Sequence, residues 1–130
     1  MDTIRVLYAE DDPADRELTT RRLARHAPHV KLDLAPTVSE ALDKLEAGAV
    51  DLVLSDFRLP DGTGWDLMQE LSATKPVRAI AISGHNTDVD IERSRKVGFL
   101  DHIAKPLVAE ELTAAIERAV TKPRPTGAPH

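Results

Sequence analysis

Five side chains, spread along the whole chain, have the residue types to bind a cation and to attack an electrophile: Glu10, Asp11, Asp56, Ser83 and Lys105. Three carboxylates brought within a few ångströms of one another repel, so such a group retains protons or binds a cation. Ligation by oxygen atoms alone, from two carboxylates and water, suits Mg²⁺. The serine adds a hydroxyl donor, and the lysine adds a positive charge. The sequence therefore predicts a magnesium site beside a nucleophilic aspartate.

Asp56 follows a stretch that indicates a buried strand. Leu52–Leu54 is a short, unbroken apolar run, which is typical of a parallel strand covered on both faces. Asp56 stands just past its end, and a loop with proline and glycine residues leads to Gly64. Open α/β sheets bind ligands at the carboxyl ends of their strands. The alternative is that Asp56 caps the next helix, but that helix begins about eight residues later, too far for a cap.

Apolar runs and amphipathic stretches alternate along the chain. The expected strands are Ile4–Ala9, Lys31–Ala35, Leu52–Leu54, Val77–Ile82 and Phe99–Ile103. The expected helices run from Pro13 to about His26, from Val38 to Gly48, from Gly64 to about Ala73, over Asp88–Val97 and from Val108 to Ala119. Five strand–helix units predict an α/β fold, a parallel sheet with helices on both faces. Right-handed crossovers limit the possible topologies, and among these we expect the flavodoxin-like strand order 2-1-3-4-5.

The first expected helix has a clear beginning. Asp12 before Pro13 is typical of an N-cap followed by proline in the first turn. We expect Ala14, Leu18 and Leu23 to face the core.

The third and fourth expected helices differ in their apolar content. In the third, Leu67, Met68 and Leu71 are expected to point inward. Asp88–Val97 has Ile91 and Val97 as its main apolar positions among charged residues. We therefore expect this helix to be among the less stable parts of the fold.

The expected strand order brings the reactive side chains together. Strands 1 and 3 are neighbours in that order, so Glu10, Asp11 and Asp56 meet at one edge of the sheet. Ser83 ends the fourth strand and Lys105 follows the fifth, at the same edge. Nothing in the sequence matches a hydrolytic triad or a glycine-rich phosphate loop. The alternative for Lys105 is a surface lysine whose stem covers apolar side chains.

Length and composition limit the remaining possibilities. The chain has 130 residues, which suits one domain, and we expect it to span residues 1–120 with a mobile, proline-rich tail over residues 121–130. A net charge of −5, from 22 acidic and 17 basic residues, argues against a nucleic-acid surface. There is no cysteine, no signal-peptide pattern and no apolar run that could span a membrane. The simplest inference is a cytoplasmic protein without membrane or nucleic-acid partners.

The chain resembles a response-regulator receiver domain over roughly residues 3–120. The family has an acidic pair after strand 1, a phosphoaccepting aspartate after strand 3, Ser or Thr after strand 4 and Lys-Pro after strand 5. Here these are Glu10 and Asp11, Asp56, Ser83, and Lys105-Pro106, and the loop at residues 59–62 (Leu-Pro-Asp-Gly) also matches. Five motifs in this order are specific to the family. The sequence around Ser83 and around Lys105 is similar to that of receivers in hybrid histidine kinases.

The resemblance implies phosphoryl transfer. A histidine kinase or a histidine phosphotransfer protein would present a phosphohistidine, and Asp56 would attack it in line. Mg²⁺ would be held by Asp11, Asp56 and the backbone carbonyl of Arg58, and by Glu10 through water. Asp12 more closely resembles a helix cap than a member of the acidic pair.

The resemblance also assigns roles on the other side of the site. Lys105 would pair with the phosphoryl oxygens, and Ser83 would hydrogen-bond to them. The Lys105–Pro106 peptide bond is expected to be cis, because the family turn directs the lysine back to the site.

One position departs from the family. The switch position three residues before the lysine is usually aromatic, and here it is His102. An imidazole can fill the same pocket with a polar edge that titrates; the alternative is a half-buried strand residue without a switching role. His85 and Arg58 flank the site where the family tunes phosphoryl lifetime, and the alternative for both is a solvated loop residue.

The leading interpretation is a receiver domain that is not an enzyme and acts by protein contact, with no output domain after residue 120. Two other classes of function stay open. Haloacid-dehalogenase-like phosphohydrolases use an aspartate nucleophile after strand 1 in an Asp-x-Asp-x-Thr pattern, which residues 10–13 lack. The third class is an interaction module that is never phosphorylated. Turnover of a phosphate ester, compared with stoichiometric labelling by acetyl phosphate, separates the three.

Overall fold

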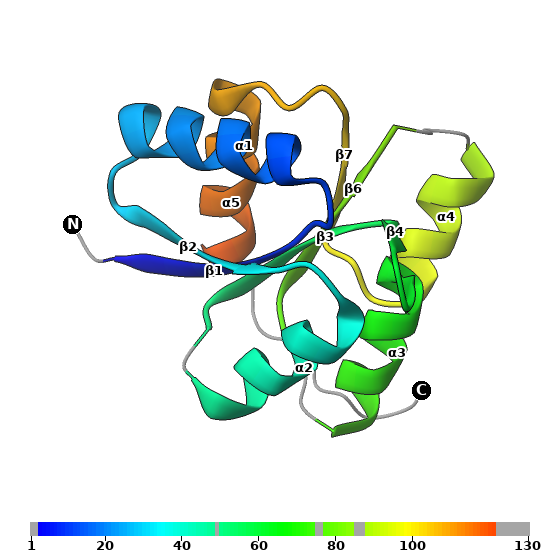
Figure 1. Cartoon of the computed structure of the whole chain (residues 1–130). Coiled ribbons are helices and arrows are strands. Elements are labelled where there is room, and N and C mark those ends of the chain that lie inside the picture. The colour runs from blue at the N-terminus through cyan, green and yellow to red at the C-terminus, as the bar shows by residue number, and fades with distance from the viewer. Residues whose placement is uncertain (1–2, 49, 75–76, 85–87, 122–130) are drawn as a thin grey trace.

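The computed structural model describes residues 3–48, 50–74, 77–84 and 88–121 (Figure 1). Its strands are β1 (Ile4–Ala9), β2 (Val30–Ala35), β3 (Leu52–Asp56), β4 (Arg58–Leu59), β5 (Gly62–Thr63), β6 (Ala79–Ser83) and β7 (Asp101–Ala104). Its helices are α1 (Pro13–His26), α2 (Val38–Ala47), α3 (Gly64–Thr74), α4 (Asp88–Lys96) and α5 (Ala109–Thr121). The expected tail, apart from Thr121, lies outside the described residues.

Five strands form one parallel sheet in the order β2-β1-β3-β6-β7, which confirms the predicted order. Helices α1 and α5 lie on one face of this sheet, and α2 and α3 lie on the other, with α4 beside α3 (Figure 1). β4 and β5 form a short antiparallel hairpin inside the expected loop after β3. The sequence does not indicate this hairpin, because its two-residue strands are too short to show an apolar alternation.

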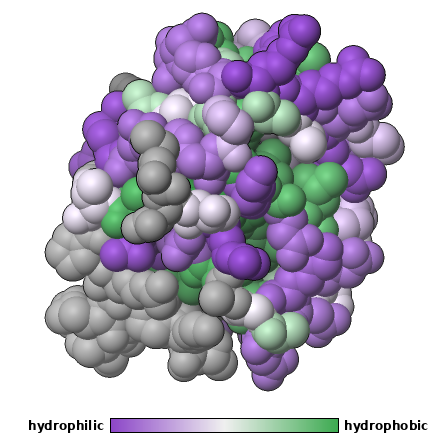
Figure 2. All heavy atoms as spheres, turned by 90° about the vertical axis from the view of Figure 1, so that its left-hand side faces the viewer, coloured by the Kyte–Doolittle hydropathy of each residue, from purple (hydrophilic) through white to green (hydrophobic). Residues whose placement is uncertain are grey.

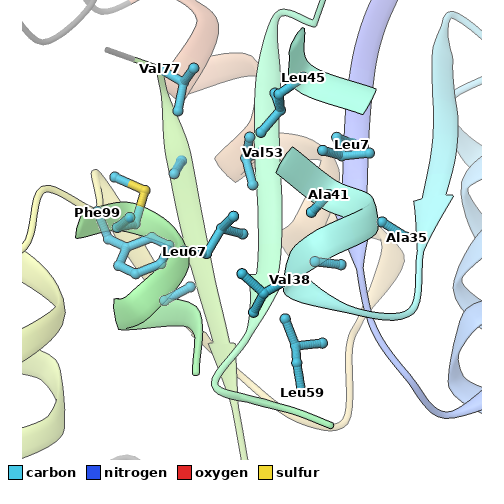
Figure 3. Packing of buried hydrophobic residues seen from close by; sticks show 14 residues of the cluster. Leu7, Ala35, Val38, Ala41, Leu45, Val53, Leu59, Leu67, Val77 and Phe99 are labelled. Carbon is cyan, nitrogen blue, oxygen red and sulfur yellow. The ribbon is translucent and has the colours of Figure 1, made fainter. Parts of the chain in front are cut away.

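The sheet separates two apolar cores. Along β1, Leu7 faces α2 and α3, whereas its neighbour Tyr8 faces α1 and α5, as expected when side chains alternate along a strand. Figure 3 shows the first core, in which Leu45 of α2 lies beside Val53 of β3 and Val38 of α2 lies near Leu59. Burying each such side chain stabilises the fold by roughly 1.5–3 kcal/mol. These two cores hold the carboxyl ends of the strands in place.

The inward face of α1 differs from the prediction. Leu18 is 45% exposed and Ala14 is also exposed, while Thr19 and Leu23 are buried. Thr19 is inward because its hydroxyl lies 3.4 Å from the buried phenol oxygen of Tyr8 and satisfies it. The prediction failed because it followed apolar residues alone and missed a polar side chain with a buried partner.

β6 and β7 both begin two residues later than expected, at Ala79 and at Asp101. In β7 the reason is that Phe99 donates its backbone N–H to the carbonyl of Ser94 at the end of α4. Gly98 has a φ of 108°, a left-handed conformation that glycine adopts without strain, and α4 ends just before it.

Helix α4 has few buried anchors, as the sequence predicted. Ile91 and Val97 are only partly buried, Val89 is 75% exposed, and Ser94 is the buried residue among those whose side chains are described in this helix. In α3, Leu67 and Met68 are buried as expected, while the side chain of Leu71 lies outside the described part.

Figure 2 shows the left-hand side of Figure 1, the end of the sheet away from the carboxyl ends of the strands. Hydrophilic residues dominate this surface, and hydrophobic residues show between them in smaller areas.

In the part of the chain that the structure describes, no helix has the length and apolar character needed to cross a membrane.

Candidate functional site

The register of the sheet places the reactive residues at one edge. β3 extends two residues beyond the expected Leu54, because Ser55 and Asp56 still pair with β6, so Asp56 is the last residue of the strand and not a residue past its end. Ala9 of β1 pairs with Ser55 of β3, and Glu10 therefore emerges next to Asp56. Asp56 pairs in turn with Ile82 of β6, one residue before Ser83. Lys105 follows the last strand, and its backbone N–H donates to the carbonyl of Ser83 at 2.9 Å. The predicted convergence is therefore present.

Lys105 is the centre of the site. Its Nζ atom lies 2.7 Å from Oδ2 of Asp56 and 2.8 Å from Oε1 of Glu10. A third carboxylate, that of Asp15, lies 3.3 Å away through Oδ2. Burial lowers the pKa of the Lys105 ammonium, but the carboxylates of Asp56 and Glu10 outweigh it, and the pKa is raised. The lysine is thus a permanent positive charge and not a solvated surface residue.

Glu10 is the most buried acid of the site, with a residue exposure of 1%. Burial raises its pKa from 4.5 to about 7; the hydrogen bond from Lys105 opposes this shift and the nearby Asp56 adds to it. Oε2 of Glu10 accepts the backbone N–H of Asp12 at 3.3 Å, which fixes the orientation of the carboxyl group.

The acidic group fits a divalent cation. Ligand oxygens of Glu10, Asp11 and Asp56 all lie within 4.8 Å of one another. Glu10 and Asp56 are buried and Asp11 is exposed, so the group opens to solvent on one side. All donors are hard oxygen atoms, and water has access from the open side, which is the chemistry that Mg²⁺ requires.

Asp12 caps α1, as the sequence predicted. Its Oδ1 accepts the backbone N–H of Ala14 at 2.8 Å and that of Asp15 at 3.4 Å. Its extended backbone and Pro13 in the first turn complete the cap. Glu10 and Asp11, and not Asp12, are the residues whose ligand oxygens group with those of Asp56.

The loop after Asp56 is held in place by two features. Gly64 lies so close to Asp56 that an added Cβ would stand 2.7 Å from the backbone oxygen of Asp56. Asp61, in the turn of the hairpin, accepts the backbone N–H groups of Val38 at 2.7 Å and Ser39 at 3.0 Å. These two bonds lower the pKa of Asp61 and tie the hairpin to the first turn of α2, next to its cap Thr37.

Arg58 lies at the start of this hairpin. Its backbone N–H is 3.5 Å from Oδ1 of Asp56, so the two oxygens of Asp56 face different partners, Arg58 and Lys105. The exposed side chain of Arg58 lines the open pocket above the acids, which measures about 910 Å³.

Ser83 is 2% exposed and lines the same pocket. The Lys105–Pro106 peptide bond is cis, as the sequence analysis expected. His85 lies outside the described residues. The predicted site residues that are described, apart from His102 and Pro106, therefore line one pocket.

His102 lies behind this pocket and not in it. Its ring meets the ring of Phe57 edge-on, with centroids 5.1 Å apart, and its ring nitrogens are buried. Phe57 follows Asp56 directly and also contacts Trp65, at a centroid distance of 4.7 Å. His102 is thus partly buried against the residue next to Asp56, which is compatible with both interpretations of its role.

Asp15, Trp65 and Arg93 line this pocket but are not among the predicted site residues. Asp15 was not recognised as a partner of Lys105, although its place in the first turn of a helix that starts at the site was a usable signal. Trp65 and Arg93 both line the pocket, and the Arg93 guanidinium lies over the indole ring at 3.8 Å from its centroid. No short-range pattern in the sequence indicates this contact between α3 and α4.

Comparisons with known proteins agree with this geometry. A family model described as the response regulator receiver domain matches residues 6–117. The two-component response regulator ORR1 of Oryza sativa subsp. japonica is 34% identical over 119 residues, covering 83% of this chain and 52% of that protein. The DNA-binding transcriptional regulator NtrC of Azospirillum brasilense is 30% identical over 129 residues, covering 98% of this chain and 26% of that protein. The chain thus spans about half or less of the length of these relatives.

Solved structures give the same result. The non-phosphorylated HemR receiver domain from Leptospira biflexa is 30% identical with a TM-score of 0.80, covering 95% of this chain and 98% of that chain. A response regulator receiver domain protein from Methanospirillum hungatei JF-1 is 25% identical with a TM-score of 0.81, covering 92% and 95% of the two chains. The family model covers most of the chain, and the strand order agrees with it. This chain therefore belongs to the response-regulator receiver domain family of two-component signalling.

Proposed function

We propose that this chain accepts a phosphoryl group on Asp56 and signals or relays it through protein contact. The observation that carries the proposal is the position of the Lys105 ammonium, 2.7 Å from Asp56 and 2.8 Å from Glu10, beside three clustered carboxylates. An ammonium held at a buried aspartate can neutralise the charge that a transferred phosphoryl group brings. Such transfer depends on positioning and on charge stabilisation more than on covalent machinery.

The donor would be a phosphohistidine on a histidine kinase or a histidine phosphotransfer protein. A carboxylate oxygen of Asp56 forms a bond to phosphorus while the phosphorus–nitrogen bond of the donor breaks. The electron pair of that bond stays on the imidazole, which takes up a proton. Lys105 leaves the Asp56 oxygen and pairs with a phosphoryl oxygen, and Ser83, which lines the same pocket, donates its hydroxyl to another.

Mg²⁺ fits the proposed reaction. Asp11, Asp56 and the backbone carbonyl of Arg58 would hold it, with Glu10 reached through water. The bound ion would supply positive charge for the phosphoryl oxygens.

Acetyl phosphate provides the test, because it donates a phosphoryl group without a partner protein. Incubation with acetyl phosphate and Mg²⁺ should add one phosphoryl group, seen in the intact mass, and chelation of Mg²⁺ should prevent it. Undiminished incorporation in Asp56→Ala would overturn the assignment. Steady turnover of an aryl phosphate ester would instead favour a phosphohydrolase, the second candidate from the sequence.

A further inference from the structure

Three carboxylates, and not two, surround the ammonium of Lys105. Asp15 of α1 lies 3.3 Å from Nζ, next to the contacts with Asp56 and Glu10. We propose that Asp15 is a positioning residue for phosphoryl transfer: it holds the Lys105 ammonium at the solvent side of the pocket while the Asp56 oxygen reacts. This proposal rests on the proposed phosphoacceptor function.

Asp15 differs from the other two partners in exposure and in place. Its side chain is 44% exposed, compared with 1% for Glu10 and 12% for Asp56. It belongs to the first turn of a helix and not to a strand end. It also lies outside the group of oxygens suited to a cation, which consists of Glu10, Asp11 and Asp56. Asp15 is therefore the one partner among these three that neither reacts nor serves as a candidate metal ligand.

The reaction requires the lysine to move. In this structure Nζ of Lys105 donates a hydrogen bond to Oδ2 of Asp56, so one carboxylate oxygen of the nucleophile is engaged. An ammonium has three N–H donors, one for each of its carboxylate partners here. If the hydrogen bond from Lys105 to Asp56 opens and Glu10 is the only remaining partner, the ammonium is drawn toward the buried Glu10 carboxylate and away from solvent. Asp15, on the solvent side, keeps the ammonium where a phosphoryl oxygen arrives.

The backbone of Asp15 is fixed independently of its side chain. Asp12 caps the helix and accepts the Asp15 N–H at 3.4 Å. Nη1 of Arg16 donates to the carbonyl of Glu10 at 3.1 Å and ties the same turn to the site. Replacing the Asp15 side chain therefore leaves the helix start in place, so that its effect on the lysine can be measured by itself.

The test compares initial rates of labelling by acetyl phosphate and Mg²⁺ in matched variants of the full chain. Asp15→Ala should label about threefold to fivefold more slowly, the loss expected for one partly exposed ion pair. Asp15→Asn, which keeps an acceptor oxygen but no charge, should fall between Ala and the wild type. Glu17→Ala is the control, because it removes an acid from the same helix whose ion-pair partner is Arg21. It should label within twofold of the wild type.

A double-mutant cycle decides whether Asp15 acts through Lys105. In a Lys105→Gln background the Asp15→Ala change should have no further effect. A second measurement needs no phosphorylation: the side-chain ¹⁵N–¹H signal of the Lys105 ammonium, assigned by its loss in Lys105→Arg. This signal should shift in Asp15→Ala and stay in place in Glu17→Ala.

The outcomes separate the two proposals. Normal labelling in Asp15→Ala, an equal loss in Glu17→Ala, or the same loss in the Lys105→Gln background would overturn the role of Asp15 alone. An unshifted Lys105 signal in Asp15→Ala would do the same, even if Lys105→Gln does not fold. Failure of the wild type to label at all would overturn the phosphoacceptor function, and the role of Asp15 with it.

Discussion

The guanidinium of Arg93 lies over the indole ring of Trp65, 3.8 Å from its centroid, and joins α4 to α3 at the mouth of the pocket. The indole Nε1 also donates to the hydroxyl of Ser94 at 3.2 Å. On its other side Trp65 contacts Phe57, the neighbour of Asp56. A series of side-chain contacts thus connects the proposed phosphorylation site with a helix that has few buried anchors.

This connection predicts a response in α4. Beryllofluoride, a phosphoryl mimic, should change both the Trp65 emission and the hydrogen exchange of residues 88–108. A full switch from 1:99 to 99:1 needs about 5.5 kcal/mol. Two charge-assisted contacts, from Lys105 and Ser83, supply about 1.5–3 kcal/mol each, so a partial shift is expected. Arg93→Gln should reduce the response in α4, whereas changes confined to the loops after Asp56 and Ser83 would refute this output face.

The acidic pair can be tested by comparing neighbouring residues. Asp11→Ala should weaken Mg²⁺ binding strongly, because it removes a direct carboxylate ligand. Asp12→Ala should bind Mg²⁺ nearly as well as the wild type, but it should lose about 1 kcal/mol of unfolding free energy with the helix cap. Calorimetric Mg²⁺ titration and denaturant unfolding measure the two effects. A larger loss of Mg²⁺ binding in Asp12→Ala would mean that the pair is Asp11 and Asp12.

Burial of Glu10 predicts a pH dependence of stability in Mg²⁺-free buffer. Its pKa rises from 4.5 to about 7 on folding, so the folded state binds the proton more tightly than the unfolded chain. The unfolding free energy should therefore fall as the pH rises through this window. The pKa of Asp61 is lowered, so this residue changes the unfolding free energy only at a pH below the range set by Glu10. Glu10→Gln is the control, and denaturant titrations with a chelator should show a flatter profile for it; an unchanged profile would argue against Glu10 as the source.

Gly64, the first residue of α3, should be less replaceable than Gly84, which follows β6. A Cβ at Gly64 would stand 2.7 Å from the backbone oxygen of Asp56, while one at Gly84 would meet no atom within 4 Å. Gly64→Ala should lower the unfolding free energy by about 1–3 kcal/mol and slow labelling, because the backbone of the nucleophile must shift. Gly84→Ala, measured in the same way, should behave like the wild type. Equal stability of the two variants would contradict this close approach.

Much of the fold was predictable because its signals are local. The buried run before Asp56 and the cap at Asp12 each depend on a few neighbouring residues, and right-handed crossovers leave few possible sheet orders. The motif spacing also placed Lys105 beside Asp56. What failed required knowledge of tertiary partners: Thr19 is inward because its hydroxyl meets the buried phenol of Tyr8, whereas Leu18 is exposed. The pairing of Asp15 with Lys105, 90 residues apart, likewise depends on how α1 meets the loop after β7.

The central claim is that the phosphoryl group is carried by the carboxylate of Asp56. Borohydride reduces an aspartyl phosphate to homoserine, which remains in the chain and can be located by tandem mass spectrometry of peptides. After labelling with acetyl phosphate and Mg²⁺, this account predicts homoserine at position 56, absent without Mg²⁺ and absent in Asp56→Asn. Homoserine at another aspartate, or phosphate retained on a residue that borohydride does not reduce, would contradict it.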